Sequence, residues 1–204
     1  MRAVILAGGA MRDYGYIRQF ILPDDYIIAA DSGYRHAEVL GLHPHVLLGD
    51  FDSLGAIPPD VELHRVPMEK NFTDTELAIE WVRAQGIDDI LILGAIGTRM
   101  DHTLTNILLL SRLLDAGGRA EVIDEHNRIW ITDQALEIEA APGETLSLIP
   151  LTTCQGVTTH NLTYPLKEAR LEVGYGLGVS NVVQQSLVRV SLSEGKLLVM
   201  LCRD

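Results

Sequence analysis

Aspartates in this sequence stand where apolar runs end. The run Val46-Leu47-Leu48 is followed by Gly-Asp-Phe-Asp-Ser, so Asp50 and Asp52 are two residues apart. In an extended chain, side chains two residues apart point to the same side, which would bring both carboxylates into one small volume. Two ionised carboxylates repel each other unless a proton or a cation lies between them. The pair therefore indicates either a cation site or, as the alternative, a polar turn.

A second polar segment precedes a strongly amphipathic stretch. Lys70-Asn71-Phe72-Thr73-Asp74 places a cation and a third carboxylate at a helix start, where backbone N–H groups bind phosphate. Mg²⁺ takes one or two carboxylates together with substrate phosphates, and it would allow an acidic site to accept an anion. In the alternative interpretation, Asp74 only complements the helix dipole and Lys70 is an ordinary surface charge.

The third such segment is GAIGTRMDH, residues 94–102, which follows an apolar run and precedes a helical pattern. Its glycines suit a tight strand-to-helix turn, and Arg99 suits bidentate contact with a phosphate. Asp101 is a candidate helix cap, and His102 either orients Asp101 or is a structural histidine. Asp31 ends another apolar run in the same way. Several strand ends thus present carboxylates, glycines and cations.

Parallel strands are expected to position these segments. Up to about residue 125, helical patterns alternate with the apolar runs AVILAGG, DYIIAAD, HVLLGD and ILILGA. This alternation predicts an α/β domain with a mostly parallel sheet and flanking helices. In such open sheets, ligands bind outside the carboxyl ends of the strands, which is where the polar segments fall.

Two of the helices have clear signals. The stretch TDTELAIEWVRAQG has Thr73 as N-cap, Glu76 completing a capping box, and Gly86 as its end. The stretch DHTLTNILLLSRLLDAGG is capped by Asp101 or Thr103 and stopped by Gly117-Gly118. The residues expected to face the core are Leu77, Ala78, Trp81 and Val82 in the first helix and Leu104, Ile107, Leu108 and Leu114 in the second.

The hydrophobic pattern of the sequence changes after residue 125. Short alternating segments separated by Gly, Pro and polar turns predict antiparallel strands, with residues 193–196 (SEGK) as a hairpin loop. The sequence therefore predicts two domains, residues 1–125 and 126–204, with residues 126–141 as the connection.

Composition narrows the class of function. The 204 residues carry a formal net charge of −12, which argues against a nucleic-acid-binding protein. Residues 1–125 contain 10 Lys and Arg against 20 Asp and Glu, so the negative charge is concentrated in the first domain. Cys154 and Cys202 are too few and too far apart for a disulfide framework or a zinc site. No apolar run is long enough for a membrane span, and a cytoplasmic location is expected.

In their order and spacing, the motifs resemble the thiamine pyrophosphokinase family. The matching segments are ADSG (30–33), LGDFDS (48–53), KNFTDTE (70–76), GAIGTRMDH (94–102), SLIPL (147–151), YPL (164–166) and SN (180–181). The resemblance implies a Rossmann-like, ATP-binding N-terminal domain and a C-terminal antiparallel β-sandwich that binds thiamine. It also implies a homodimer with the thiamine site at the subunit interface. The implied reaction moves the pyrophosphoryl group of ATP to the hydroxyl of thiamine, which gives thiamine diphosphate and AMP.

The resemblance also implies roles for individual residues. Asp50, Asp52 and Asp74 would bind Mg²⁺, while Arg99 and Asp101 would lie at the phosphates and the reacting hydroxyl. The remaining binding residues would be Asp31, Lys70 and His102 for ATP and Ser180 and Asn181 for thiamine. The chain departs from the family pattern at Ser32, Asn71, Thr98 and Val182 and in residues 161–163, before the YPL segment.

Three other functions use the same residue types. A metal-dependent phosphoesterase would hydrolyse phosphate esters without an acceptor, and a nucleotidyltransferase would release pyrophosphate. A non-catalytic nucleotide sensor would bind ATP and turn over nothing.

Overall fold

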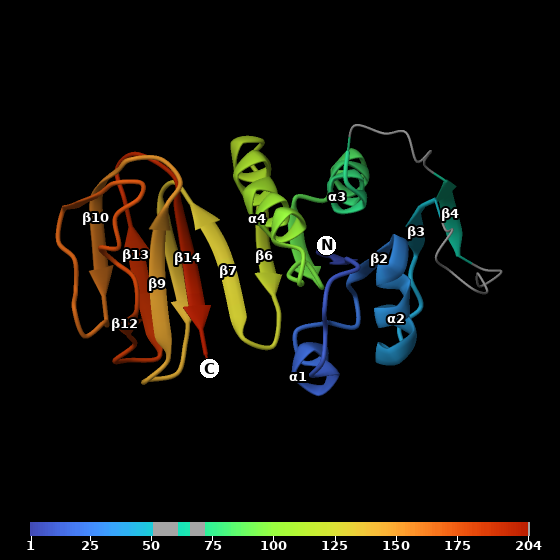
Figure 1. Cartoon of the computed structure of the whole chain (residues 1–204), viewed down its shortest axis with the longest axis horizontal. Helices are drawn as coiled ribbons and strands as arrows, with labels where there is room; N and C mark the ends of the chain where they lie inside the picture. The colour runs from blue at the N-terminus through green and yellow to red at the C-terminus, as the bar shows by residue number, and fades with distance from the viewer. Residues whose placement is uncertain (51–60, 66–71, 204) are drawn as a thin grey trace. The chain divides into compact units, whose positions relative to one another are not determined.

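The structure is a computed structural model that describes residues 1–50, 61–65 and 72–203. The chain forms two compact units, Met1–Glu125 and His126–Asp204 (Figure 1). Each unit has its own cluster of buried apolar side chains, so each is described separately below.

The N-terminal unit is built on a parallel sheet, as the alternation of apolar runs predicts. In its described part, the strands are β1 (Ala3–Leu6), β2 (Tyr26–Ala30), β3 (Val46–Gly49), β4 (Glu62–Arg65), β5 (Asp89–Leu93) and β6 (Arg119–Ile123). They are arranged in the order β6-β5-β1-β2-β3-β4, and every neighbouring pair is parallel. The chain runs outward from β1 to β4 and then returns to β5 on the other side of β1. The strand order therefore reverses between β1 and β5.

Helices cover the sheet in two pairs. The helices are α1 (Tyr14–Arg18), α2 (Tyr34–Leu40), α3 (Asp74–Ala84) and α4 (Met100–Asp115), with a short 3₁₀ turn, η1 (Asp31–Gly33), before α2. α1 contacts α2, and α3 contacts α4. Because parallel crossovers are right-handed, reversing the direction of travel places the two pairs on opposite faces. Strands covered on both faces must be apolar throughout, and β1 is buried at every residue.

The ends of α3 agree with the sequence prediction. The Thr73 side chain accepts a hydrogen bond from the backbone N–H of Glu76 at 3.2 Å, which confirms Thr73 as the N-cap. Gly86, just past the helix, has a φ of 77°, a left-handed conformation that glycine adopts without strain. Of the four expected core residues, Ala78 and Val82 are buried, whereas Leu77 and Trp81 are half-buried.

The predicted core face of α4 is wrong. Leu104 and Leu108 are 53% and 52% exposed, and Ile107 and Leu114 are only half-buried. The buried residues of this helix are Thr103, Asn106, Leu110 and Leu113. The N-cap is Arg99, without a side-chain cap hydrogen bond, rather than Asp101 or Thr103. The face differs because two polar side chains are buried here for hydrogen bonding, so counting apolar residues alone selects the wrong stripe.

The C-terminal unit consists of antiparallel strands. They are β7 (Asn127–Thr132), β8 (Ala135–Glu139), β9 (Thr145–Pro150), β10 (Cys154–His160), β11 (Ala169–Leu171), β12 (Asn181–Val182), β13 (Leu187–Ser191) and β14 (Leu197–Cys202). Pairing gives the orders β12-β9-β14-β7 and β11-β10-β13-β8. One buried cluster includes Ile138 of β8, Leu148 of β9 and Val199 of β14, so both groups of strands share a core.

Two details of this unit differ from the expectation. Residues 126–141, expected as a connection, contain β7 and β8, because their alternating apolar residues pack into the core. Residues 193–196 do not close a hairpin: β13 pairs with β8 and β10, whereas β14 pairs with β7 and β9. Alternation predicts that a segment is a strand but does not specify its partner.

Among the described residues, no helix combines the length and the apolar character that crossing a bilayer requires.

Candidate functional site

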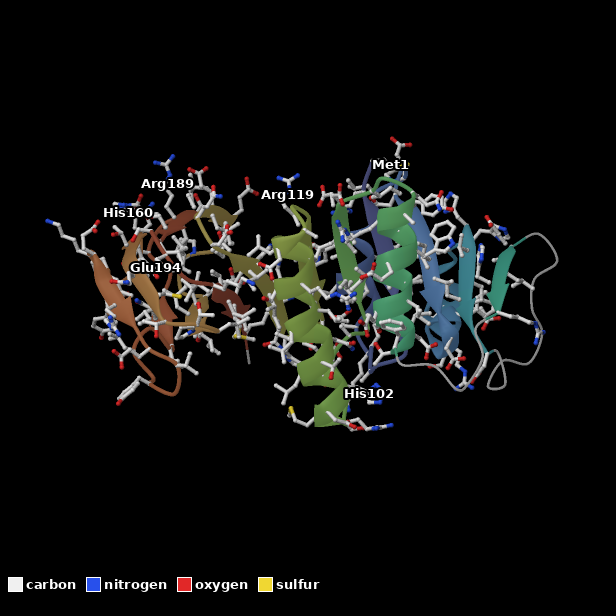
Figure 2. All side chains as sticks on the ribbon, turned by 90° about the horizontal axis from the view of Figure 1, so that it is seen from above. Met1, His102, Arg119, His160, Arg189 and Glu194 are labelled. Carbon is white, nitrogen blue, oxygen red and sulfur yellow. The ribbon has the colours of Figure 1, made fainter. Side chains whose placement is uncertain are left out.

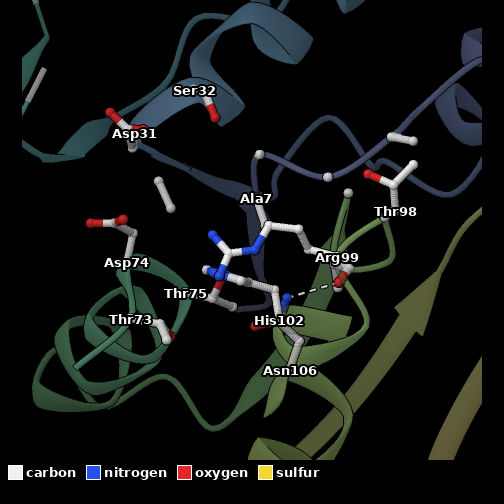
Figure 3. Close-up of a pocket in the computed structure, with 17 residues that line it drawn as sticks. Ala7, Asp31, Ser32, Thr73, Asp74, Thr75, Thr98, Arg99, His102 and Asn106 are labelled. Carbon is white, nitrogen blue, oxygen red and sulfur yellow. Dashed lines mark hydrogen bonds between the residues drawn. The ribbon is translucent and has the colours of Figure 1, made fainter. Parts of the chain in front are cut away.

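A cavity of about 490 Å³ lies at the carboxyl edge of the parallel sheet, beside the point where the strand order reverses. The loops after β1 and β5 form its floor, and η1 and the starts of α3 and α4 complete its wall. Its side chains include Asp31, Asp74, Arg99 and His102 (Figure 3). In Figure 2, Met1 and Arg119 lie at one end of the unit, where β1 and β6 begin, and His102 lies at the opposite end.

Two glycine turns pack directly on each other in this floor. The N–H of Gly9 donates to the carbonyl of Gly94 at 2.7 Å, and the N–H of Ala10 donates to the carbonyl of Ile96 at 3.0 Å. A Cβ added to Gly9 would come within 2.3 Å of the Gly94 oxygen. Gly94 has a φ of 67°, and a Cβ there would meet the carbonyl oxygen of Ala7 at 2.4 Å. Only glycine allows the two turns to come this close.

Helix α4 holds the second turn through two buried polar side chains. Asn106 Nδ2 donates to the carbonyl of Ala95 at 2.8 Å, the dashed bond in Figure 3. Thr103 Oγ1 accepts from the N–H of Gly97 at 3.1 Å and lies 3.2 Å from its carbonyl, to which it donates. Sequence reasoning missed Asn106 and considered Thr103 only as a helix cap. The available signal was their spacing of three, which places two small polar groups on one helix face behind a glycine turn.

Two carboxylates lie on one side of the cavity (Figure 3). Asp31 directly follows β2, and Asp74 is the first residue of α3. Gly49, the last residue of β3, packs against Asp31, since a Cβ on Gly49 would lie 3.1 Å from both the Cα and the Cβ of Asp31. Asp50, the next residue along the chain, is half-buried and is not among the lining residues.

Arg99 and Asp101 form a bidentate ion pair at the start of α4. Arg99 Nε and Nη2 donate to the two carboxylate oxygens of Asp101, at 3.2 and 2.6 Å. The hydrogen bond from Arg99 lowers the pKa of Asp101 to about 2, with a smaller contribution from the backbone of His102. Arg99 lines the cavity, while Asp101 does not. Both side chains are exposed, so the guanidinium is accessible from the cavity.

The structure thus brings four of the predicted site residues together around one cavity, namely Asp31, Asp74, Arg99 and His102. Asp101 pairs with Arg99, and Asp50 follows Gly49, which packs against Asp31. Asp52 and Lys70, together with the departure at Asn71, lie outside the described residues. Within the described ranges, no three His, Cys, Asp or Glu side chains gather closely enough to hold a metal ion by themselves.

Ser180 and Asn181 belong to the C-terminal unit. Asn181 is 7% exposed, and its Oδ1 accepts from the N–H of Tyr164 at 3.0 Å while its Nδ2 donates to the carbonyl of Tyr164 at 2.7 Å. The N–H of Ser180 donates to Ser147 Oγ at 3.0 Å, with Ser180 in a left-handed conformation. Asn181 therefore ties the SN motif to the YPL motif and fixes the backbone that carries the exposed Tyr164 ring.

Comparison with known proteins agrees with this two-part architecture. Residues 17–122 match the family model of the thiamin pyrophosphokinase catalytic domain, and residues 133–197 match that of the thiamin pyrophosphokinase vitamin B1 binding domain. The chain is 30% identical over 189 residues to thiamine pyrophosphokinase of Bacillus subtilis (strain 168), a match covering 87% of each protein.

Solved structures show the same likeness. The chain resembles a thiamine pyrophosphokinase structure from Bacillus subtilis with a TM-score of 0.90 and 26% identity, over 100% of both chains. It resembles one from Geobacillus thermodenitrificans with a TM-score of 0.88 and 28% identity, over 100% of this chain and 98% of the other. The matches cover both units, and the chain belongs to the thiamin pyrophosphokinase family.

Proposed function

We propose that this protein transfers the pyrophosphoryl group of ATP to the hydroxyl of thiamine, giving thiamine diphosphate and AMP. The observation that carries the proposal is the cavity at the reversal between β1 and β5, which combines two glycine turns with Asp31, Asp74 and Arg99. Family membership supplies the substrate pair.

The nucleotide belongs at the Rossmann-like edge of the N-terminal unit. Ligands of open parallel sheets occupy the crevice where the strand order reverses, and about 490 Å³ falls in the range typical of small-molecule sites. Gly8 and Gly9 of the first turn and Gly97 of the second line the cavity, so their backbone groups would meet a phosphate bound there. Arg99 at the start of α4 would add a fixed positive charge beside them.

Magnesium fits the carboxylates of this edge. Asp74 lies in the cavity wall, and Asp50 follows Gly49, which packs against Asp31. Carboxylate oxygens are the ligands that Mg²⁺ prefers. Asp50 and Asp74 would hold the ion, with Asp52 as the predicted third carboxylate. A bound Mg²⁺ would supply neutralisation of the charge on the phosphoryl oxygens. Substrate phosphates and water would complete its coordination, consistent with the lack of a complete cage among the described side chains.

The reaction then requires alignment more than proton removal. The thiamine oxygen forms a bond to the β-phosphorus of ATP as the bond to the oxygen bridging the α- and β-phosphorus atoms breaks. AMP leaves with that electron pair, and the proton of the thiamine hydroxyl is released to water. A carboxylate with a pKa of about 2 is a weak proton acceptor near neutral pH. We therefore infer that Asp101 accepts a hydrogen bond from the hydroxyl and orients it, while Arg99 stabilises the charge on the phosphoryl oxygens.

The thiamine side of the proposal rests on Ser180 and Asn181. We propose that the protein acts as a homodimer in the cytoplasm and binds thiamine at the subunit interface near these two residues. The fixed backbone at Tyr164 supports this assignment, because it presents an exposed aromatic ring as an apolar surface for a ring-containing substrate.

One assay tests the function directly. Purified protein is incubated with ATP, Mg²⁺ and thiamine, and the nucleotide products are separated. AMP that forms only in the presence of thiamine is the expected result. ADP as the sole nucleotide product would contradict the proposal, as would release of pyrophosphate or hydrolysis without thiamine. Binding of ATP without any product would instead identify a nucleotide sensor.

A further inference from the structure

We propose that His36 is a positioning residue for the nucleotide site, acting through the backbone of Gly9 and held in place by Tyr14. The inference rests on the proposed function, in that the turn at Gly9 faces bound ATP. His36 itself is not among the residues that line the cavity, so any effect on the ligand must pass through the turn.

Two hydrogen bonds fix the ring of His36. Its Nε2 lies 2.8 Å from the carbonyl oxygen of Gly9, and its Nδ1 lies 2.9 Å from the hydroxyl of Tyr14. A carbonyl oxygen can only accept, so Nε2 carries the hydrogen. In the neutral ring Nδ1 is then the acceptor, and the Tyr14 hydroxyl donates to it. Tyr14 on α1 and His36 on α2 therefore form a directed chain of donors that ends on the Gly9 carbonyl.

The same peptide is held from its other side. The N–H of Gly9 donates to Gly94, and the next N–H, of Ala10, donates to Ile96. The ring of His36 also reaches the second turn, since a Cβ on Gly94 would lie 3.4 Å from its Cδ2. The Gly9 turn is thus fixed by the loop after β5 on one side and by His36 on the other.

A glycine turn depends on such contacts for its orientation. Gly8 and Gly9 have no side chains with which to pack, and glycine backbones lose more conformational freedom on ordering than any other residue. A backbone that meets phosphate is most effective when it is already oriented before the ligand arrives. Without the bond from His36, part of the binding free energy of ATP would be used to order the turn.

A second histidine in the same unit provides the matched control. His45 Nδ1 accepts a hydrogen bond from the N–H of Ile27 at 3.0 Å, and its ring stacks on Tyr26 with the centroids 4.4 Å apart. His45 precedes β3, at the amino edge of the sheet and away from the cavity. It therefore shares with His36 a bond to the backbone but has no connection to the glycine turns.

The experiment compares His36→Leu, His36→Gln, Tyr14→Phe and His45→Leu. The KM for ATP and kcat are measured at saturating thiamine, the Kd for ATP by calorimetry, and the melting temperature by circular dichroism. Loss of one hydrogen bond predicts a rise of up to about tenfold in the KM and Kd for ATP in His36→Leu. His36→Gln, whose amide donates to Gly9, should recover most of this loss, and Tyr14→Phe should show a smaller rise.

His45→Leu should lower the melting temperature without changing the KM for ATP. An equal change in KM in His36→Leu and His45→Leu, or no recovery in His36→Gln, would overturn the positioning role. If His36→Leu does not fold, His36→Gln and Tyr14→Phe decide the question. Unchanged ATP affinity in Tyr14→Phe would contradict the chain of hydrogen bonds from Tyr14 through His36 to Gly9.

Wild-type protein that binds ATP but forms no AMP would contradict the proposed function alone, since the Kd ratios still test His36. Wild-type protein that does not bind ATP would contradict both.

Discussion

Arg99 and Asp101 are joined by two parallel hydrogen bonds, from Nε to Oδ1 at 3.2 Å and from Nη2 to Oδ2 at 2.6 Å. One edge of the guanidinium is therefore used by the carboxylate, and the proposed phosphate contact falls to Nη1 and the second hydrogen of Nη2. A pair in this geometry fixes the direction of the arginine, which a lone exposed side chain would not have.

Replacing Asp101 with Asn should lower kcat/KM. The variant keeps an oxygen acceptor but loses the charge that orients Arg99, so kcat/KM should fall by up to about tenfold. Steady-state kinetics with ATP and thiamine measure the loss. Asp88→Asn is the control, because it breaks the ion pair with Arg83, which lies outside the cavity. Full activity in Asp101→Asn would eliminate the orienting role.

The pH dependence of activity should not follow Asp101. Its pKa of about 2 lies below the value in an unfolded chain, about 3.9, so the ionised carboxylate stabilises the folded state above that pH. This contribution is lost as the pH falls toward 2. Any acid limb in kcat/KM above pH ~4 should therefore persist unchanged in Asp101→Asn. An acid limb that is present in the wild type and missing in the variant would assign that titration to Asp101.

Removing a carboxylate at the proposed magnesium site should abolish turnover and leave the fold intact. Asp50→Asn, Asp52→Asn and Asp74→Asn are each expected to reduce kcat by more than about 100-fold, because charge neutralisation at the phosphates is a main contribution to phosphoryl transfer. Circular dichroism and melting temperature report the fold, and Asp88→Asn is again the control. Chelation of divalent cations should stop the wild-type reaction, and added Mg²⁺ should restore it. Activity that survives chelation would exclude the metal proposal.

The glycine turns predict a contrast between two alanine substitutions. In Gly9→Ala the new Cβ would meet the Gly94 carbonyl oxygen at 2.3 Å, so the turns must separate and ATP binding should be lost. In Gly15→Ala the nearest contact is Asp13 Oδ1 at 3.4 Å, and alanine favours the helix α1 by about 0.5–1 kcal/mol. Calorimetric titration with ATP separates the two. Wild-type affinity in Gly9→Ala would show that the turn does not contact the nucleotide.

The orientation of α4 can be tested by substituting two leucines of the same helix. Leu110 is 1% exposed and Leu108 is 52% exposed. Leu110→Ala should lower the free energy of unfolding by about 2–5 kcal/mol, whereas Leu108→Ala should change it by less than about 0.5 kcal/mol. Urea denaturation monitored by circular dichroism gives both values. Equal losses would mean that Leu108 is covered in solution, as the proposed dimer could do, and that loss would then depend on protein concentration.

Local patterns were sufficient to predict much of the fold. Apolar runs such as that of β1 could be recognised because a parallel strand is covered on both faces, and Thr73 could be recognised because a helix start needs a local acceptor. The face of α4 could not be predicted, because Thr103 and Asn106 are buried by hydrogen bonds to a loop whose position is set by the tertiary structure. The predicted pairing of the strands that flank residues 193–196 was also wrong. The partners of β13 and β14 are set by the tertiary structure and not by the local pattern.

The candidate site could also be predicted only where local sequence rules apply. Asp31, Asp74, Arg99 and His102 could be grouped from sequence because a single rule places the carboxyl ends of parallel strands at one edge. No such rule points to His36. It stands on an unremarkable amphipathic helix, and its role depends on contacts with Gly9 and Tyr14, which form only when α1 and α2 pack on the sheet.

Asp31 has a φ of 46°, a left-handed conformation that costs residues with a Cβ about 1–2 kcal/mol. Glycine at this position would relieve that strain and remove a carboxylate from the cavity in a single change. With Asp31 in its proposed role at the nucleotide site, selection for stability and selection for activity oppose each other at this position. In a duplicated gene whose product is no longer selected for activity, glycine would be expected to replace Asp31. The residue at position 31 in close relatives would therefore indicate whether the site is still functional.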